Sequence, residues 1–444
     1  MQTIADFPYF EMQFNKEGAI HNEEEVKQIL DFLPESKVTD LFVISHGWNN
    51  DMNDARMLYQ DFFAKVRNEI NDTRPPDIGQ REFAVLGILW PSIKFADEDL
   101  IAGGAASVGI ENGEKEEIRK HLELFKGTFD NPDADKRLER AMQLLELVEA
   151  DHNAASEFVD LIRSLPHKQE IHPDDGSDEF FRIPGSTLVD ILSRPDIPIP
   201  SEGTMGGAAS FDASIGSLDS GGAAGFNFFG GVISALHKVL NFTTYFQMKE
   251  RAGVVGRTGT YSVLTQIREA HQSMKIHLIG HSFGGRLVTA LADGPAGMKP
   301  IVAESMTLLQ AAFSHNGFAS KFDGSRDGFF RKVVTEKKVK GPILITHSDK
   351  DIAVGIAYPI ASKLSGDDAA TFGDSDNHYG GIGRNGAQFT PEANNDNPLG
   401  PVTSIYQFQA GKLYNLKANT IILGHSDIVK NEIAHALLCA VVSI

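Results

Sequence analysis

The chain has 444 residues, of which 41% are hydrophobic and 23% charged, a composition that favours folded globular structure over disorder. Its formal net charge of −19 repels phosphate backbones, so we expect no nucleic-acid partner. The single cysteine, Cys439, excludes an intrachain disulfide, and its apolar surroundings predict a buried side chain.

The first residues, MQTIADFPYFEMQF, lack the basic and apolar regions of a secretory signal. Nowhere does a run of about 18 apolar residues pass without charges, so we expect no transmembrane segment. Both observations favour a cytoplasmic protein.

Short apolar runs, each ending in a turn residue, recur along the chain. Runs of this length without polar alternation are typical of strands buried on both faces of a parallel sheet. The runs lie at residues 41–44, 83–89, 276–279, 306–309, 343–346 and 420–423.

Helical patterns lie between several of these runs. Helical spacing of apolar residues marks 52–70, and a further helix is expected near 261–271. Residues 283–292 predict a helix that stops at Gly294-Pro295, and 427–442 predict one capped by Ser426 or Asp427. Alternating strands and helices predict an α/β fold with a mostly parallel central sheet flanked by helices.

About 170 residues separate Trp90 from the helix near 261, which is far more than one crossover requires. This insertion is helical and charged over 113–165 and rich in Gly, Ala and Ser over 201–231, before an aromatic group. It is interpreted either as a linker with a packed helix or as a cap over the site. On the second interpretation Phe226, Phe229 and Tyr245 contact substrate. A second stretch, 366–411, reads as an irregular loop rich in Gly and Asn.

The segment Gly280-His281-Ser282-Phe283-Gly284 fits the pattern G-x-S-x-G. A predicted strand precedes it and a predicted helix follows, which is the strand-turn-helix of a nucleophile elbow. The glycines are needed because the turn is too sharp for side chains two residues either side of the serine. Ser282 is therefore the candidate nucleophile.

A serine hydroxyl needs a base, and that base needs an orienting carboxylate. His425 follows the last predicted strand and is the preferred base, with His378 as an alternative. Asp351 and Asp349 both follow the strand at 343–346, and Asp351 is preferred. The order Ser, Asp, His along the chain is that of α/β-hydrolases.

An oxyanion requires donors that are already in place. The N–H of Phe283, the residue after the serine, is one expected donor. The other is expected from the loop His46-Gly47-Trp48 after the first predicted strand, through the backbone of Trp48.

On these residues the chain resembles an α/β-hydrolase of the esterase/lipase kind. The resemblance rests on His46-Gly47, on residues 280–284 and 348–354, and on Gly424-His425, and it covers roughly 38–90 and 258–444. It implies an eight-stranded sheet, no cofactor and acyl-enzyme chemistry through Ser282, Asp351, His425, Trp48 and Phe283. We assign 1–96 and 246–444 to the hydrolase core and 97–245 to a cap.

The expected partner is a small-molecule ester or a lipid. A thioesterase, peptidase or acyltransferase with the same three residues remains open, as does a lipase with an interfacial lid or a non-catalytic binding protein. No metal site is expected, because the acidic stretch 174–179 reads as a solvated loop and 220–231 lacks the G-K-[ST] of a phosphate loop. The sequence leaves the oligomeric state open.

Overall fold

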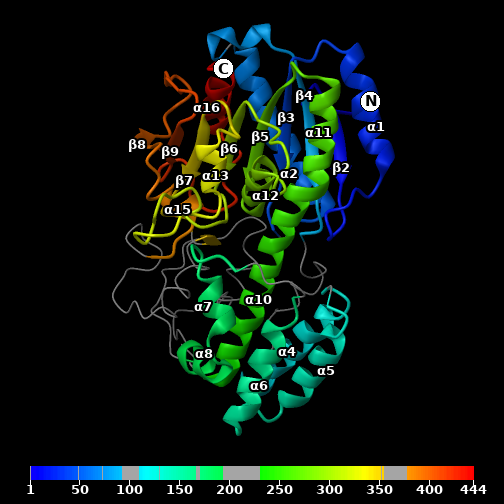
Figure 1. Cartoon of the computed structure of the whole chain (residues 1–444), viewed down its shortest axis with the longest axis vertical. Helices are drawn as coiled ribbons and strands as arrows, with labels where there is room; N and C mark the ends of the chain where they lie inside the picture. Colours follow the sequence, from blue (N-terminus) through cyan, green and yellow to red (C-terminus); the bar gives the residue numbers. More distant parts are fainter. Residues whose placement is uncertain are drawn as a thin grey trace.

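A computed structural model of the chain describes residues 2–48, 50–72, 74–92, 110–129, 131–166, 171–193, 231–351, 353–354 and 378–444. Figure 1 shows two lobes along the long axis of the molecule, one built around a sheet and the other from helices. One long helix, α10 (Val232–Val255), runs from the helical lobe to the sheet lobe.

The sheet has nine strands in the order β1-β2-β4-β3-β5-β6-β7-β9-β8. Strand β1 pairs with β2 in antiparallel orientation, and every other neighbouring pair is parallel. The strands are β1 (Gln2–Ile4), β2 (Phe7–Gln13), β3 (Asp40–Ser45), β4 (Phe83–Leu89), β5 (Lys275–His281), β6 (Ser305–Leu309), β7 (Ile343–His347), β8 (Ala393–Pro398) and β9 (Leu413–Lys417).

The α/β class with a mostly parallel central sheet is confirmed. The first five predicted runs coincide with β3, β4, β5, β6 and β7, whose residues are almost all buried. Uniformly apolar strands are expected where helices cover both faces of a sheet.

The strand predicted at 420–423 is wrong. The chain turns there, with Ile422 N–H donating to Ala418 O at 2.8 Å, while the strand beside β7 is β9. Asn415 interrupts the apolar pattern of β9, but it is buried because its side chain bonds the backbone of Ala387. Because the buried polar side chain of Asn415 has its hydrogen bonds satisfied inside the sheet, a hydrophobicity pattern does not identify β9 as a strand.

Other departures lie at the two edges of the sheet. Sequence patterns missed β1 and β2, and β8 together with α15 (Ile382–Asn385) lies in the stretch read as an irregular loop. The sheet consequently has nine strands, where the resemblance implied eight.

Helices divide between the two faces of the sheet. Leu41 and Val43 of β3 belong to the core shared with α1 (Glu23–Glu35), α11 (Tyr261–Ala270) and α12 (Phe283–Asp293). Phe42 and Ile44, whose side chains point to the opposite face, pack with α2 (Met52–Asn71) and α16 (Asn431–Val442). Short helices η1 (Pro76–Gln80) and α13 (Arg331–Thr335) complete this lobe.

The helical lobe is built on α10. It contains α4 (Ile110–Phe125), α5 (Ala134–Leu144), α6 (His152–Arg163), α7 (Ser177–Arg182) and α8 (Gly185–Leu192). Its apolar core is continuous with the face of the sheet covered by α12. α10 continues through the short π-helix η2 (Gly256–Thr260) into α11. The boundary assigned between 245 and 246 therefore falls inside one helix that belongs to both lobes.

The last helix begins later than predicted. α16 starts at Asn431, and neither Ser426 nor Asp427 caps it. Asp427 instead accepts the N–H of Leu423 at 3.0 Å and donates its own N–H to Gly424 O at 3.1 Å. These two bonds close a tight loop around residue 425, so the carboxylate that resembled a helix cap stabilises a turn.

Candidate active site

Ser282 lies at the sharp turn between β5 and α12, at the edge of the sheet where the parallel strands end. Its backbone has φ 55° and ψ −125°, in the left-handed half of φ space that non-glycine residues rarely occupy. Its N–H bonds Leu309 O at 3.1 Å, and its carbonyl accepts the N–H of Ala312 at 3.0 Å. The turn is thus fastened to the end of β6, which maintains the strained conformation.

Gly280 and Gly284 are required at this turn, as the sequence predicted. A Cβ on Gly280 would lie 2.4 Å from Gly284 O, and a Cβ on Gly284 would lie 2.1 Å from Ser45 O. Both distances are shorter than van der Waals contact with backbone, so a side chain at Gly280 would displace β5 from α12 and one at Gly284 would displace α12 from the end of β3.

Asp351 and His425 form the principal polar contact of the site. His425 Nδ1 lies 3.0 Å from Asp351 Oδ1 and 2.9 Å from Oδ2. Asp351 is fully buried, and it also accepts Gln310 Nε2–H and the N–H of Val354, each at 3.1 Å. An ionised carboxylate accepts only, so His425 carries its proton on Nδ1 and Nε2 is left as an acceptor.

His281 ties the loop of His425 to the strand that carries Ser282. His281 Nε2 lies 3.0 Å from the backbone oxygen of His425, and the two imidazole centroids are 5.0 Å apart. Burial and the neighbouring His425 lower the pKa of His281 to about 3, so it is neutral and donates from Nε2. Within the described residues, no hydrogen bond joins Ser282 Oγ to the His425 ring.

Gly47 brings the backbone of the loop after β3 against Ser282. A Cβ on Gly47 would lie 2.6 Å from Ser282 Cβ and 3.1 Å from Ser282 Oγ, so only glycine fits this approach. The backbone around Gly47 therefore lies next to the serine hydroxyl, where the sequence predicted an oxyanion loop.

His46 holds that loop in place. The N–H of Trp90 donates to His46 Nε2 at 3.3 Å, so the proton lies on Nδ1, which donates to Gly47 O at 2.9 Å. Tyr59 Oη accepts the backbone N–H of His46 at 2.8 Å and donates to Ile88 O at 2.6 Å. Burial lowers the pKa of His46 to about 4, which preserves the neutral tautomer on which the ring's bonds to Trp90 and Gly47 depend.

Three aromatic rings meet beside Ser282. Phe283 lies 6.1 Å from Trp48 and 5.1 Å from Tyr245, measured between ring centroids. Tyr245, which was predicted to contact substrate, therefore lies on α10 with its ring against Phe283, the first residue of α12. Phe226 and Phe229, predicted for the same role, lie outside the described residues.

The alternative base and acid lie elsewhere. The side chain of Asp349 bonds that of Asn419, and the ring of His378 packs against Phe322 and Tyr379. The structure brings the preferred base, His425, together with the preferred acid, Asp351. The side chains of Asp349 and His378 contact other residues.

Sequence reasoning missed four residues that support the site: His281, Gln310, Tyr59 and Trp90. Gln310 and Trp90 each follow directly after an apolar strand, at the sheet edge where functional groups gather, and this position was the available signal. Tyr59 carried no signal, because it reads as one more apolar position of α2.

The acidic loop at 174–179 is not solvated, contrary to expectation. Asp174 and Asp175 are buried, and Lys249 Nζ pairs with Asp175 Oδ2. Arg286, one turn after Ser282 on α12, donates from Nε to Lys249 O at 2.8 Å and approaches His172 Nε2 at 3.4 Å. Lys249 of α10 therefore compensates the charge of Asp175. The loop also contacts the sheet lobe, because Ser314 Oγ donates to Asp174 O and the N–H of Phe329 donates to Asp174 Oδ2 at 3.2 Å.

No group of three or more His, Cys, Asp or Glu side chains among the described residues is placed to hold a metal ion. Similarly, none of the helices in the described ranges is long and apolar enough to cross a membrane. In comparisons with known proteins, no family model, no curated protein and no solved structure matches this chain.

Proposed function

We propose that this chain is a serine hydrolase of the α/β-hydrolase class that cleaves a carboxylic ester. The observation that carries the proposal is the pairing of His425 Nδ1 with Asp351, on a loop bonded to the residue before Ser282. The strained backbone of Ser282 and the approach of Gly47 support it. These features come from four separate segments, and together they match the requirements of acyl transfer.

In the proposed reaction, His425 Nε2 takes the proton of Ser282 Oγ as that oxygen attacks the ester carbonyl. Asp351 holds the imidazole tautomer and stabilises the imidazolium that forms. The N–H groups of Phe283 and Trp48 stabilise the oxyanion, helped by the N-terminus of α12. The alcohol leaves with the proton from His425, and water then releases the acid and regenerates the serine.

Hydrolysis of 4-nitrophenyl esters by the purified protein and by Ser282→Ala tests this proposal. We expect turnover by the wild type and a loss of about 10³-fold or more in the variant, with an unchanged melting temperature. Equal rates would exclude Ser282 as the nucleophile. Matched thioester and amide substrates would decide whether an ester is the preferred class.

A further inference from the structure

Gln310 is a fully buried side chain that contacts the carboxylate of Asp351. It follows directly after β6, and the proposed reaction gives it no role. Its amide nitrogen donates to Asp351 Oδ2 at 3.1 Å and to Gly383 O at 2.8 Å, so both N–H bonds of the amide are used. A rotated amide would place Oε1 against these two acceptors, so the contacts fix the orientation of the side chain.

Each oxygen of the Asp351 carboxylate has a donor besides His425. Oδ1 accepts the N–H of Val354 at 3.1 Å, and Oδ2 accepts the amide of Gln310. Because His425 Nδ1 lies 3.0 Å from Oδ1 and 2.9 Å from Oδ2, the carboxylate presents both oxygens to the imidazole. Without the Gln310 bond, His425 would be the only donor to Oδ2 among the described residues, and the carboxylate could rotate about its Cβ–Cγ bond.

The backbone of Gln310 lies in the left-handed region, with φ 44°, which residues other than glycine rarely adopt. The N–H of Gln310 donates to Thr346 Oγ1 at 3.2 Å, and this bond helps to hold the conformation. The same segment holds the nucleophile turn, because Leu309 and Ala312 bond the backbone of Ser282. Backbone strain of this kind concentrates at functional sites, where the surrounding structure maintains it.

We propose that Gln310 is a positioning residue for the candidate base and acts through Asp351. Its amide holds the carboxylate with both oxygens toward Nδ1, which keeps the His425 ring in one orientation and its proton on Nδ1. This inference rests on the proposed function, because it gives Gln310 a part in the activation of Ser282.

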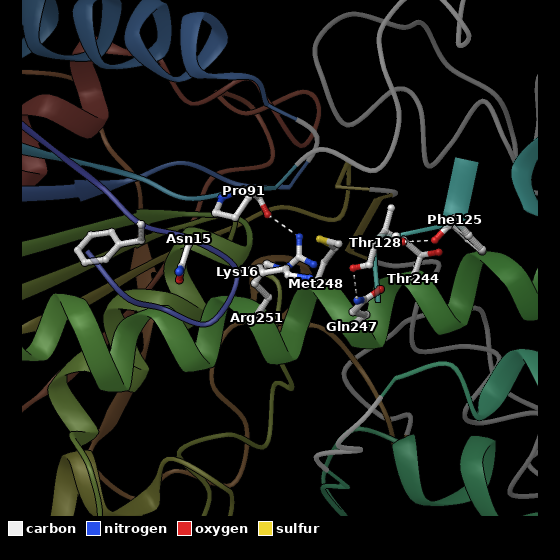
Figure 2. A pocket seen from close by; sticks show the side chains of 11 residues that line it. Asn15, Lys16, Pro91, Phe125, Thr128, Thr244, Gln247, Met248 and Arg251 are labelled. Atoms are coloured by element: carbon white, nitrogen blue, oxygen red, sulfur yellow. Dashed lines mark hydrogen bonds between the residues drawn. The ribbon is translucent and has the colours of Figure 1, made fainter. Parts of the chain in front are cut away.

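Gln310→Met tests the role of the amide, because Met has a similar length and volume and no N–H donor. We expect kcat for a 4-nitrophenyl ester to fall by about tenfold and KM to change by less than about twofold, since the buried side chain does not contact substrate. Gln247→Met is the matched control and should keep the wild-type kcat. Gln247 Nε2 donates to Thr128 O at 3.4 Å beside a cavity that neither Asp351 nor His425 lines (Figure 2).

The imidazole proton of His425 gives a second readout that does not require hydrolysis. A proton held between Nδ1 and a carboxylate resonates at low field and exchanges slowly with water. In NMR spectra of protein with isotopically labelled histidines, we expect a low-field Nδ1–H resonance that is absent in His425→Gln and in Asp351→Asn. It should move to higher field or broaden beyond detection in Gln310→Met, and stay unchanged in Gln247→Met and Ser282→Ala.

An unchanged resonance or a wild-type kcat in Gln310→Met would overturn the inference. A wild type without the low-field resonance would also overturn it, since Asp351 and His425 would then not be paired. If the wild type hydrolyses no ester but the resonance responds to Gln310→Met as expected, the proposed function fails and the positioning of His425 by Gln310 stands. Gln310→Asn keeps an amide that is too short to reach Asp351, so it should give the same spectral change if Gln310→Met does not fold.

Discussion

His281 Nε2 donates to the backbone oxygen of His425 at 3.0 Å, so the residue before the candidate nucleophile anchors the loop of the candidate base. These two histidines are 144 residues apart in the sequence. The bond orients the His425 loop from one side, and Asp351 orients the ring from the other. His281 is therefore a positioning residue in the proposed mechanism.

Replacing His281 by leucine should lower kcat for ester hydrolysis by about tenfold, because one hydrogen bond to the His425 loop is lost. KM should change little, since the bond positions the base and does not contact substrate. Gln, which retains a donor, should recover part of the rate. His152→Leu, on an exposed side chain of α6, is the control. Unchanged kcat in His281→Leu would exclude the positioning role.

Gly47→Ala should reduce activity about 100-fold or more, because the added Cβ would lie 2.6 Å from Ser282 Cβ. Gly79→Ala is the matched control, since a Cβ at Gly79 meets nothing within 4 Å. Steady-state rates and circular dichroism of both variants check the prediction. Full activity in Gly47→Ala would mean that the loop after β3 is not part of the reacting centre.

Lys249→Met should lower the free energy of unfolding by about 3–5 kcal/mol, because it leaves the buried Asp175 carboxylate without its cation. Urea denaturation measures this change. Lys136→Met, which breaks an exposed pair with Asp133, should cost less than about 1 kcal/mol. Adding Asp175→Leu to Lys249→Met should recover part of the stability. A similar small loss in both single variants would contradict a structural role for the buried pair.

Stability should fall as the pH drops below about 6.5. Burial lowers the pKa of His46, His315 and His347 to about 4, and that of His281 to about 3, from an ordinary value of 6.5. Between these values the unfolded chain takes up protons that the folded chain does not. Each proton that only the unfolded chain binds lowers the free energy of unfolding by about 1.4 kcal/mol per pH unit. Above pH 6.5 these histidines are neutral in both states, and their full contribution to stability is present.

Urea denaturation at pH 7, 6 and 5 checks this dependence. His315→Asn removes one of these buried histidines and should reduce the slope by up to one proton. A slope identical to that of the wild type would show that His315 does not contribute. His152→Asn, with an exposed ring, should leave the slope unchanged.

Local patterns predicted the centre of this protein better than its edges. Strands β3 to β7 each contain a short run that is mostly apolar, so hydrophobicity located them, and the glycines around Ser282 marked the turn between β5 and α12. β9 was missed because Asn415 is satisfied by backbone contacts with Ala387, which only the folded chain supplies. Asp427 was misread for a similar reason, since a turn residue and a helix cap use the same side chain.

The candidate site follows the same division. The sequence pattern selected Ser282 and Asp351 because they follow β5 and β7, and strand ends and glycines are local signals. His425 was selected through the strand predicted at 420–423, which is a turn, so its selection rested on an incorrect element. The bonds from His281, Gln310 and Trp90 join segments far apart in the chain, and no local signal encodes their partners. The Gln310–Asp351 contact, for example, depends on the parallel pairing of β6 and β7.

Labelling with a fluorophosphonate probe, read by intact-protein mass and peptide mapping, tests most directly whether Ser282 is an activated nucleophile. We predict one adduct, mapped to Ser282, in the wild type and in Asp349→Asn. Labelling should be lost in Ser282→Ala and slowed about 100-fold or more in His425→Gln and Asp351→Asn. An unlabelled wild type, or an adduct at any residue other than Ser282, would contradict the proposed mechanism.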